Sequence, residues 1–330
     1  MTGITLLSEA DLRGCVALDL ASIEAIEQAF VLLATAAVAM PPILRLDIPE
    51  HNGEVDVKTA YLQGLDRFAI KVSPGFFDNP GLGLPSLNGM MMLLSARTGL
   101  LDALLLDNGY LTAVRTAAAG AVAARCLSRA GSRSVALIGA GEQAALQLQA
   151  LRLVRPIETV RVWARDSARV ATFSAELARD SGLTVTPCAS IDDAMTGVDI
   201  AITCTPSREP LIEVRHLHPG LHITAMGSDA EHKNEISPQA LAMVDRYVAD
   251  RLSQTRILGE LHHALAAGVI ADESGFAELG QVLAGQRSGR TSEVQITLCD
   301  LTGTGAQDTA MANLAFERAR SAGKGFQFGS

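Results

Sequence analysis

The stretch SVALIGAGEQA, residues 134–144, decides the fold that the sequence predicts. Its first part, Ser134 to Ile138, is a short apolar run typical of a buried strand, and helical periodicity follows the glycines. The turn Gly139-Ala140-Gly141-Glu142-Gln143-Ala144 matches the pattern G-x-G-x-x-[GA]. Glycines at these positions let backbone amides approach a pyrophosphate, whose charge the N-terminus of the helix stabilises. Because the motif stands between a strand and a helix, we predict that it binds a dinucleotide.

Strands and helices alternate along the chain after this motif. The helical segment DSARVATFSAELARDSG begins with an Asp or Ser cap, and strand-like runs surround it: TVRVWAR, TVTPCAS, DIAITCTPS, HITAMGSD, MVDRYVAD and VQITLCDLTG. This alternation predicts a doubly wound, mostly parallel sheet, and therefore an α/β protein with a Rossmann dinucleotide-binding domain. A second glycine cluster, residues 302–305, follows the last of these strands. We interpret it as a crossover near the cofactor, with phosphate binding as the alternative, and expect the final helix to leave the nucleotide domain.

The end of the second strand of this series bears on the choice between NAD and NADP. An acidic residue at this place would hold the ribose 2′-hydroxyl, whereas an arginine would accommodate a 2′-phosphate. The sequence here is Trp163-Ala164-Arg165-Asp166, with Ala164 at the expected acid position. Asp166 could reach the ribose and Arg165 could face a phosphate, so NAD is expected with NADP still open.

Composition excludes several classes of function. The chain has 330 residues, a net charge of −9 and few aromatic residues, and it has no basic patch, so no nucleic-acid partner is expected. The sequence has neither the pattern of a signal peptide nor an apolar run long enough to cross a bilayer, so we expect no membrane partner and a cytoplasmic location.

The cysteines and histidines suggest neither disulfides nor metal binding. The five cysteines lie far apart without a CxxC pair, which indicates buried thiols in a reducing compartment. His216, His218 and His222 are close in sequence, but Pro219 and Gly220 place a turn between them. No carboxylate or thiolate joins them at ligand spacing, so no metal site is predicted.

Three strand-like runs near the N-terminus, ILRLDI, EVDVKTAYL and RFAIKVS, are separated by turn-rich segments and predict two consecutive hairpins. Pairing across the second turn places Lys58 opposite Lys71, and pairing across the first places Arg45 opposite Lys58. Directly opposed cations repel, so something anionic should bind them. The alternatives are that Lys71 belongs to a solvated or edge position, or that a register is off by one, which moves a strand's side chains to the other face.

Two further residues have positions typical of a ligand site. Arg115 lies just inside the helical segment LDNGYLTAVRTAAAGAVAARCLSR, next to small residues that allow close packing. Asp229 follows the strand HITAMG, and ligands bind at the carboxyl ends of strands in open α/β sheets.

Four segments together resemble the ornithine cyclodeaminase/mu-crystallin family: AIKVSPGFFDNPGLGLPSLNG, LDNGYLTAVRTAAAGAVAA, IGAGEQA and MGSDAEHKNEI. The similarity covers almost the whole chain and keeps the order of the family's motifs. The resemblance implies a homodimer, with a substrate and dimerisation domain of residues 1–122 and 307–330 and a Rossmann domain of residues 123–306. In this family the N-terminal α/β domain is completed by the C-terminal helix.

The resemblance also implies roles for particular residues. Arg45, Lys71 and Arg115 would bind the substrate carboxylate, and Asp229 would be catalytic, with Lys71 as a candidate acid. The residues expected to bind the cofactor are Arg115, Thr116, Gly139, Ala140, Gly141, Glu142, Gln143, Arg165, Asp166, Thr203, Thr205, Pro206, Met226, Gly227, Ser228, Asp229 and Gly303.

The family includes cyclodeaminases, NAD(P)H-dependent reductases of imines and keto acids, and a non-enzymatic NADPH-binding protein. A pocket for ornithine must accept a distal ammonium, and Lys58 beside Lys71 instead favours a distal carboxylate. The chain most resembles the members that reduce iminosuccinate. We therefore expect NADH-dependent reduction of a small anionic imino dicarboxylate, iminosuccinate to L-aspartate. The alternatives are an NAD-dependent cyclodeaminase acting on ornithine or diaminobutyrate, and a non-catalytic NADPH-dependent binding protein.

Overall fold

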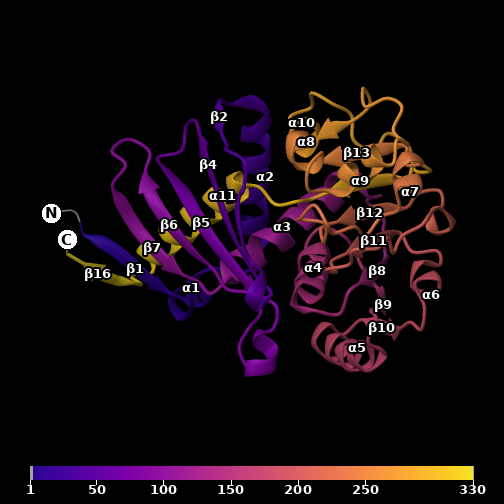
Figure 1. Cartoon of the computed structure of the whole chain (residues 1–330), viewed down its shortest axis with the longest axis horizontal. Coiled ribbons are helices and arrows are strands. Elements are labelled where there is room, and N and C mark those ends of the chain that lie inside the picture. Colours follow the sequence, from indigo (N-terminus) through magenta and orange to yellow (C-terminus); the bar gives the residue numbers. More distant parts are fainter. Residues whose placement is uncertain (1–2, 330) are drawn as a thin grey trace. The chain divides into compact units, whose positions relative to one another are not determined.

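The computed structural model describes residues 3–329 (Figure 1). The chain divides into two compact units, and the boundaries fall after Arg115 and after Gly303. The first unit therefore combines the N-terminal part of the chain with its C-terminal part, and the second is continuous in sequence.

The first unit is built on a mixed sheet with the order β16-β1-β7-β6-β5-β4-β2, and β3 also pairs with β4. Within residues 3–329, the pair β1 and β7 is parallel and the other pairs of this sheet are antiparallel. Alternation along β4 and β5 buries one set of side chains, including Ala60, Leu62 and Ala69. The strands are β1 Ile4–Ser8, β2 Val38–Ala39, β3 Leu44–Ile48, β4 Gly53–Leu62, β5 Arg67–Phe76, β6 Met90–Ser95, β7 Leu101–Leu106 and β16 Phe326–Phe328.

Helix α11, Gly305–Ser321, packs on β4 and β5 beside α2, Leu20–Thr35, while α1 is Glu9–Cys15 (Figure 1). Close approach depends on Gly305, because a Cβ there would lie 2.3 Å from the carbonyl oxygen of Thr59. The hydroxyl of Thr309 accepts a hydrogen bond from Ala69 N at 3.0 Å and donates to Ala60 O at 2.9 Å. These contacts fix the first turns of α11 against the middle of the two strands.

The register of β4 against β5 is as predicted, and Lys58 is the direct partner of Lys71. The prediction that Arg45 lies opposite Lys58 is wrong, because Arg45 pairs with Asp56. The reason is the first turn: residues 49–51 form a 3₁₀ helix and Asn52 is left-handed with φ 46°, so pairing resumes at Gly53. The shift is by two residues, so the side chains keep the face that was predicted.

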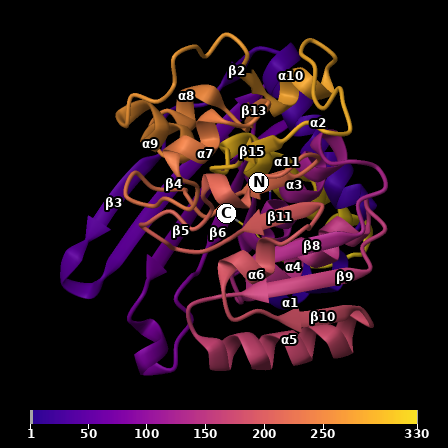
Figure 2. The same cartoon turned by 90° about the vertical axis from the view of Figure 1, so that its right-hand side faces the viewer.

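The second unit contains an all-parallel sheet with the order β10-β9-β8-β11-β12-β15-β13-β14 (Figure 2). Residues of β8 alternate between two apolar clusters, with Val135 and Leu137 in one and Ala136 and Ile138 in the other. Both faces of the strand are thus buried, as expected in a doubly wound sheet. The predicted α/β class with a Rossmann-type sheet is confirmed.

The strands of the second unit are β8 Ser134–Ile138, β9 Thr159–Trp163, β10 Thr184–Pro187, β11 Ile200–Thr203, β12 His222–Ala225, β13 Arg246–Ala249, β14 Ala277–Glu278 and β15 Thr297–Asp300. Its helices are α4 Glu142–Arg152, α5 Ser167–Ser181, α6 Ile191–Met195, α7 Pro238–Ala242, α8 Leu252–Thr255, α9 Glu260–Ala266 and α10 Leu279–Leu283. The first unit boundary falls within α3, Tyr110–Leu127. Among residues 3–329, no helix has the length and apolar character needed to cross a bilayer.

Candidate active site

A buried cluster of charges lies in the first unit, where α11 meets β4 and β5. Lys71, Lys58 and Arg115 expose 1%, 6% and 6% of their surface, and Asp308 exposes none. The ammonium Nζ of Lys71 lies 2.9 Å from Oδ2 and 3.0 Å from Oδ1 of Asp308. The guanidinium Nε of Arg115 lies 3.0 Å from Oδ1 of the same carboxylate. Lys58, Lys71 and Arg115 therefore lie in one cluster, as predicted, and the carboxylate of Asp308 lies among them.

This environment changes the protonation of Lys71. Burial lowers its pKa, the positive charges of Arg115 and Lys58 lower it further, and Asp308 acts in the opposite direction, with a net value of about 7. An ammonium group in this range can donate a proton near neutral pH. Lys71 thus has the property required of an acid.

Asp308 is the residue that sequence reasoning missed. Burial alone would raise the pKa of its carboxyl, but Lys71 and Arg115 outweigh that effect and hold the pKa below its usual range. The carboxylate is therefore ionised. One signal was present in the sequence: Asp308 is the acid in the first turn of α11, among the small and apolar residues GAQDTAMA.

Asp107, between β7 and α3, is a second buried acid near the cluster. It exposes 1% of its surface and accepts a hydrogen bond from Leu111 N at 2.8 Å. Burial raises its pKa, and hydrogen bonds from backbone N–H groups, together with the charge of Lys71, partly oppose that rise. Asp107 was not among the predicted site residues.

Arg45 has different partners from those predicted. Its guanidinium contacts Asp47 at 2.9 Å and Asp56 at 3.9 Å, and it forms an ion pair with Glu54. Its charge is therefore compensated by acids of β3 and β4. Substrate binding by Arg45 remains a prediction.

The predicted cofactor residues of the second unit follow the ends of neighbouring parallel strands, so they share one edge of the sheet. Glu142 and Gln143 open α4 directly after the glycine turn. Thr203, Thr205 and Pro206 stand at the end of β11. Met226 to Asp229 follow β12, and Gly303 follows β15, where its N–H donates to Asp250 at 2.7 Å.

The glycine turn fits a pyrophosphate. Gly139 has φ 133°, and a Cβ there would lie 2.9 Å from Sγ of Cys204. Gly141 is the N-cap of α4 and provides no side-chain cap, and a Cβ there would meet nothing within 4 Å. Space is therefore open beside the helix N-terminus, and a helix N-terminus without a side-chain cap is suited to binding phosphate.

Glu235 connects the loops that follow β11 and β12. This fully buried carboxylate accepts hydrogen bonds from Thr203 Oγ1 at 2.7 Å, Thr205 N at 2.6 Å, Thr205 Oγ1 at 2.7 Å and Gly227 N at 2.8 Å. A Cβ on Gly227 would lie 2.2 Å from Thr205 O and 2.5 Å from the Glu235 carboxylate. Glu235 thus holds two loops of the predicted cofactor edge together, although the sequence analysis did not identify it.

At the ribose position, Asp166 is the N-cap of α5 and accepts from Ala168 N at 2.9 Å and Arg169 N at 3.1 Å. Arg169 donates through Nε to Ala140 O at 3.0 Å, and Arg165 is exposed. The segment after β9 therefore contains the guanidinium groups of Arg165 and Arg169. It also contains the carboxylate of Asp166, which caps α5.

The remaining predicted positions have local partners. Asp229 forms an ion pair with Lys233 at 2.6 Å, and Ser228 donates to Lys233 O at 2.5 Å. On α3, the carbonyl of Thr116 accepts from Gln147 Nε2 at 3.0 Å.

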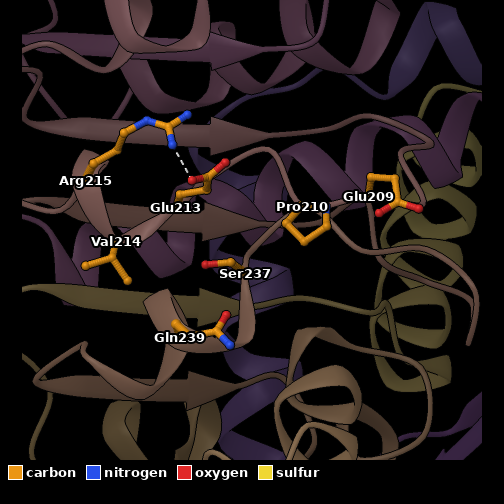
Figure 3. A pocket seen from close by; sticks show the side chains of 7 residues that line it. All are labelled: Glu209, Pro210, Glu213, Val214, Arg215, Ser237 and Gln239. Atoms are coloured by element: carbon orange, nitrogen blue, oxygen red, sulfur yellow. Dashed lines mark hydrogen bonds and ion pairs between the residues drawn. The ribbon is translucent and has the colours of Figure 1, made fainter.

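A hollow of about 670 Å³ lies elsewhere in the second unit, between the segment after β11 and the start of α7 (Figure 3). Arg215 points toward Glu213 and forms an ion pair with it, while Glu209 lies at the other end. None of the predicted substrate or cofactor residues is among those that line it, which are Glu209, Pro210, Glu213, Val214, Arg215, Ser237 and Gln239. We therefore treat the buried charges as the candidate substrate site of the first unit and the glycine turn as the candidate cofactor site of the second.

Comparison with known proteins confirms the resemblance that the sequence predicted. The model of the ornithine cyclodeaminase/mu-crystallin family matches residues 5–323. A Rhizobium meliloti protein named as a dehydrogenase is 61% identical and is covered over 100% of both chains. An uncharacterised cyclodeaminase of Sinorhizobium fredii is 56% identical, with 99% of this chain and 100% of that protein covered.

Solved structures of several relatives are similar over nearly the whole chain. Thermococcus litoralis Δ1-pyrroline-2-carboxylate reductase, in complex with NADH and L-proline, has a TM-score of 0.92 at 30% identity, with 98% of this chain and 99% of that chain covered. An archaeal alanine dehydrogenase dimer with bound NAD has a TM-score of 0.91 at 31% identity, with 99% of each covered. The iminosuccinate reductase of Paracoccus denitrificans, in complex with NAD⁺, has a TM-score of 0.89 at 30% identity, with 99% and 100% covered.

Proposed function

Because this chain belongs to the ornithine cyclodeaminase/mu-crystallin family, we propose that it reduces a small imino dicarboxylate with NADH, converting iminosuccinate to L-aspartate. Homologues in the family are NAD(P)-dependent oxidoreductases acting on imines. One observation carries the choice of substrate: the buried Lys58 lies directly opposite the buried Lys71.

The charge of the cluster supports an anionic substrate. Lys58 and Arg115 are cationic, Lys71 is protonated in part near neutral pH, and Asp308 contributes one negative charge. Basic side chains thus predominate in this cluster, and a predominantly basic lining favours a negatively charged ligand. A second carboxylate on the substrate would pair with Lys58, whereas the distal ammonium of ornithine would be repelled by it.

The glycine turn and the neighbouring loops would hold NAD, with the 2′-hydroxyl or 2′-phosphate near Arg165 and Asp166. A bound nicotinamide would supply the hydride for the reduction. Arg115 would hold the α-carboxylate and Lys58 the distal one, as positioning contributes much of the rate in such reactions. Lys71 would donate a proton to the imine nitrogen, with Asp308 as its counter-ion, and Asp229 would orient the substrate or relay a proton.

The first test is a panel of NADH-oxidation assays with oxaloacetate plus ammonia, pyruvate plus ammonia, cyclic imines, and ornithine or diaminobutyrate. A reductase consumes NADH with an imine, whereas a cyclodeaminase releases ammonia without net change in the cofactor. Turnover of ornithine with ammonia release and no NADH consumption would replace the proposal with the cyclodeaminase function.

Lys58→Met then tests the distal carboxylate. Hydrogen bonds to charged groups contribute about 1.5–3 kcal/mol, so we expect KM for the dicarboxylic imine to rise roughly 10- to 100-fold. KM for a monocarboxylic imine should stay within about threefold, and Lys324→Met, an exchange on the surface, should change neither. An unchanged KM for the dicarboxylic imine would refute the role of Lys58.

We extend the proposal to a cytoplasmic homodimer. The first unit exposes Leu44 and Leu46 on β3 at 61% and 55%, and Leu82 and Leu87 at 74% and 64%. Several large apolar side chains at the surface of one unit favour association. The five cysteines, all present as free thiols, suit a reducing compartment. Light scattering during size-exclusion chromatography would measure the mass, and a monomer at micromolar concentration would contradict the dimer.

A further inference from the structure

The first turn of α11 contains buried polar groups that lack hydrogen-bond partners. Thr304 and Gln307 expose none of their surface. Among the described residues, neither Oγ1 of Thr304 nor Nε2 of Gln307 has a partner. Leaving a buried donor unsatisfied costs about 1–3 kcal/mol, so two such groups within one turn point to a ligand that accepts hydrogen bonds.

The orientation of Gln307 is fixed by its neighbour. Nη1 of Arg115 donates to Oε1 of Gln307 at 3.0 Å. Because a guanidinium can only donate, the oxygen of the amide must face Arg115, and the NH₂ group must face elsewhere. The amide therefore lies beside the guanidinium and offers a donor to a third partner.

The N-terminus of α11 also has backbone N–H groups that need a hydrogen-bond acceptor. Thr304 is the N-cap of α11 but makes no side-chain cap bond, and Gly305 and Ala306 behind it are buried. The first N–H groups of a helix have no acceptor within the helix, and this end carries a partial positive charge. With 17 residues, α11 is long enough for that charge to develop.

We propose that Thr304, Gln307 and the N-terminus of α11 form, with Arg115, the subsite that binds the α-carboxylate of the imino acid. The inference rests on the proposed function and names residues beyond those expected from the family. A carboxylate is an acceptor with two oxygens, so it satisfies the Thr304 hydroxyl, the Gln307 amide and helix N–H groups together. Arg45, whose charge is already compensated by three acids, is not required at this subsite.

Two imines that differ only in the carboxylate provide the test: Δ1-pyrroline-2-carboxylate and 1-pyrroline. The wild-type enzyme should prefer the carboxylated imine in kcat/KM with NADH. Gln307→Met and Thr304→Val keep the volume of each side chain and remove the donor. Each should reduce that preference about tenfold, which corresponds to one lost hydrogen bond of about 1.4 kcal/mol, while KM for NADH stays within about twofold.

Asn313→Ala is the matched control, because Asn313 lies in the same helix and donates to Thr309 O at 2.9 Å and Arg67 O at 3.3 Å. It should lower stability without changing the preference for the carboxylated imine. If the donor-deleting variants also keep the wild-type preference while remaining folded, the subsite is refuted.

Calorimetric titration of succinate into the enzyme with NAD⁺ makes the test independent of turnover. Gln307→Met and Thr304→Val should each weaken succinate binding about tenfold. Succinate affinity that is equal in wild type and variants would overturn the inference. An enzyme that reduces no imine yet shows this loss of succinate binding would refute the proposed reduction and leave the carboxylate subsite in place.

Discussion

At the scale of the residue, Lys71 shows how burial changes an ordinary side chain. An exposed lysine keeps its proton well above neutral pH, but burial and two nearby cations bring the pKa of Lys71 to about 7. Asp308 acts in the opposite direction, and the buried side chains of both residues meet at 2.9 Å. The carboxylate therefore keeps Lys71 protonated over a wider range of pH than burial alone would allow.

This balance predicts the pH dependence of activity. If protonated Lys71 is the acid, kcat/KM should be high below pH 7 and should fall as pH rises through about 7. Asp308→Asn removes the charge that raises the pKa of Lys71, so the falling limb should move to lower pH by roughly one unit. Lys71→Ala should lose about 10²- to 10⁴-fold in kcat.

The measurement is kcat/KM against pH for the wild type and both variants, with circular dichroism as a check on folding. Asp11→Asn, an exchange in the first turn of α1, is the control and should leave the profile unchanged, because Asp11 is partnered by Ser8. A falling limb that stays at the same pH in Asp308→Asn would show that Asp308 does not set the protonation of Lys71.

The sequence predicted the cations of this site but not their counter-ion. Lys58 and Lys71 belong to two strands joined by a short turn, so the period of two and the turn length were enough to place them opposite one another. Asp308 follows Lys71 by more than two hundred residues, and its position depends on how α11 packs on the sheet. No local pattern encodes that packing, although a lone acid in a turn of small residues is a signal that could be sought.

At the scale of the element, the approach of α11 to β4 depends on one glycine. A Cβ at residue 305 would lie 2.3 Å from Thr59 O and 2.9 Å from Thr59 N, both of them backbone atoms. Gly305→Ala must therefore displace the helix, and overpacking of this kind costs typically 1–3 kcal/mol. We expect the free energy of unfolding to fall by that amount in urea, together with a loss of imine reduction.

The same exchange at Gly14 is a matched control. Gly14 lies in α1 of the same unit, and a Cβ there would meet nothing within 4 Å. Gly14→Ala should leave stability unchanged or raise it by about 0.5–1 kcal/mol. If both variants have the stability of the wild type, close packing at Gly305 does not position α11.

Glu235 makes a similar link between two loops of the parallel sheet. In Glu235→Gln an NH₂ group replaces an oxygen that accepts from a backbone N–H, so two donors face one another, at a cost of about 1–3 kcal/mol. We expect the affinity for NADH to fall about tenfold, while ADP-ribose, which has no nicotinamide, should change by less than about threefold.

Fluorescence titration with NADH and competition by ADP-ribose provide the measurement. Glu278→Gln is the control, because Glu278 also accepts from a backbone N–H, that of Leu252 at 3.0 Å, and belongs to the same unit. Equal losses for both ligands in Glu235→Gln would indicate a general loss of structure and not a role in positioning the two loops.

Elements were predicted best where periodicity and turn chemistry agree. The strand, turn and helix at residues 134–152 follow from an apolar run, two glycines and a helical pattern. The register of β3 was wrong because a 3₁₀ turn and a left-handed Asn52 place the turn at residues 49–52, one residue earlier than expected, which composition alone does not reveal. Short strands such as β14, with two residues, carry too little pattern to be found.

At the scale of the whole molecule, the two ends of the chain build one unit and its middle builds the other. The predicted cofactor loops belong mainly to the middle, whereas the buried cations and the first turn of α11 belong to the ends. Binding of a cofactor and binding of an anionic substrate should therefore protect different segments of the chain from hydrogen exchange.

One hydrogen-exchange experiment can measure the protection of both sets of segments. With NADH alone, exchange should slow within residues 139–143, 203–206 and 226–229, because a bound cofactor covers the glycine turn and the neighbouring loops. Adding L-aspartate should slow exchange further at residues 305 and 306, since the first amides of a helix lack acceptors until an anion binds them, whereas the amide of Gln307 already donates to Thr304 O at 3.2 Å. Lys58→Met should abolish the protection by L-aspartate and keep the protection by NADH, because the charge of Lys58 would bind the dicarboxylic ligand and not the dinucleotide. If L-aspartate gives the same protection in Lys58→Met as in the wild type, Lys58 does not bind the substrate. If NADH does not slow exchange in the loops, the glycine turn does not bind the cofactor.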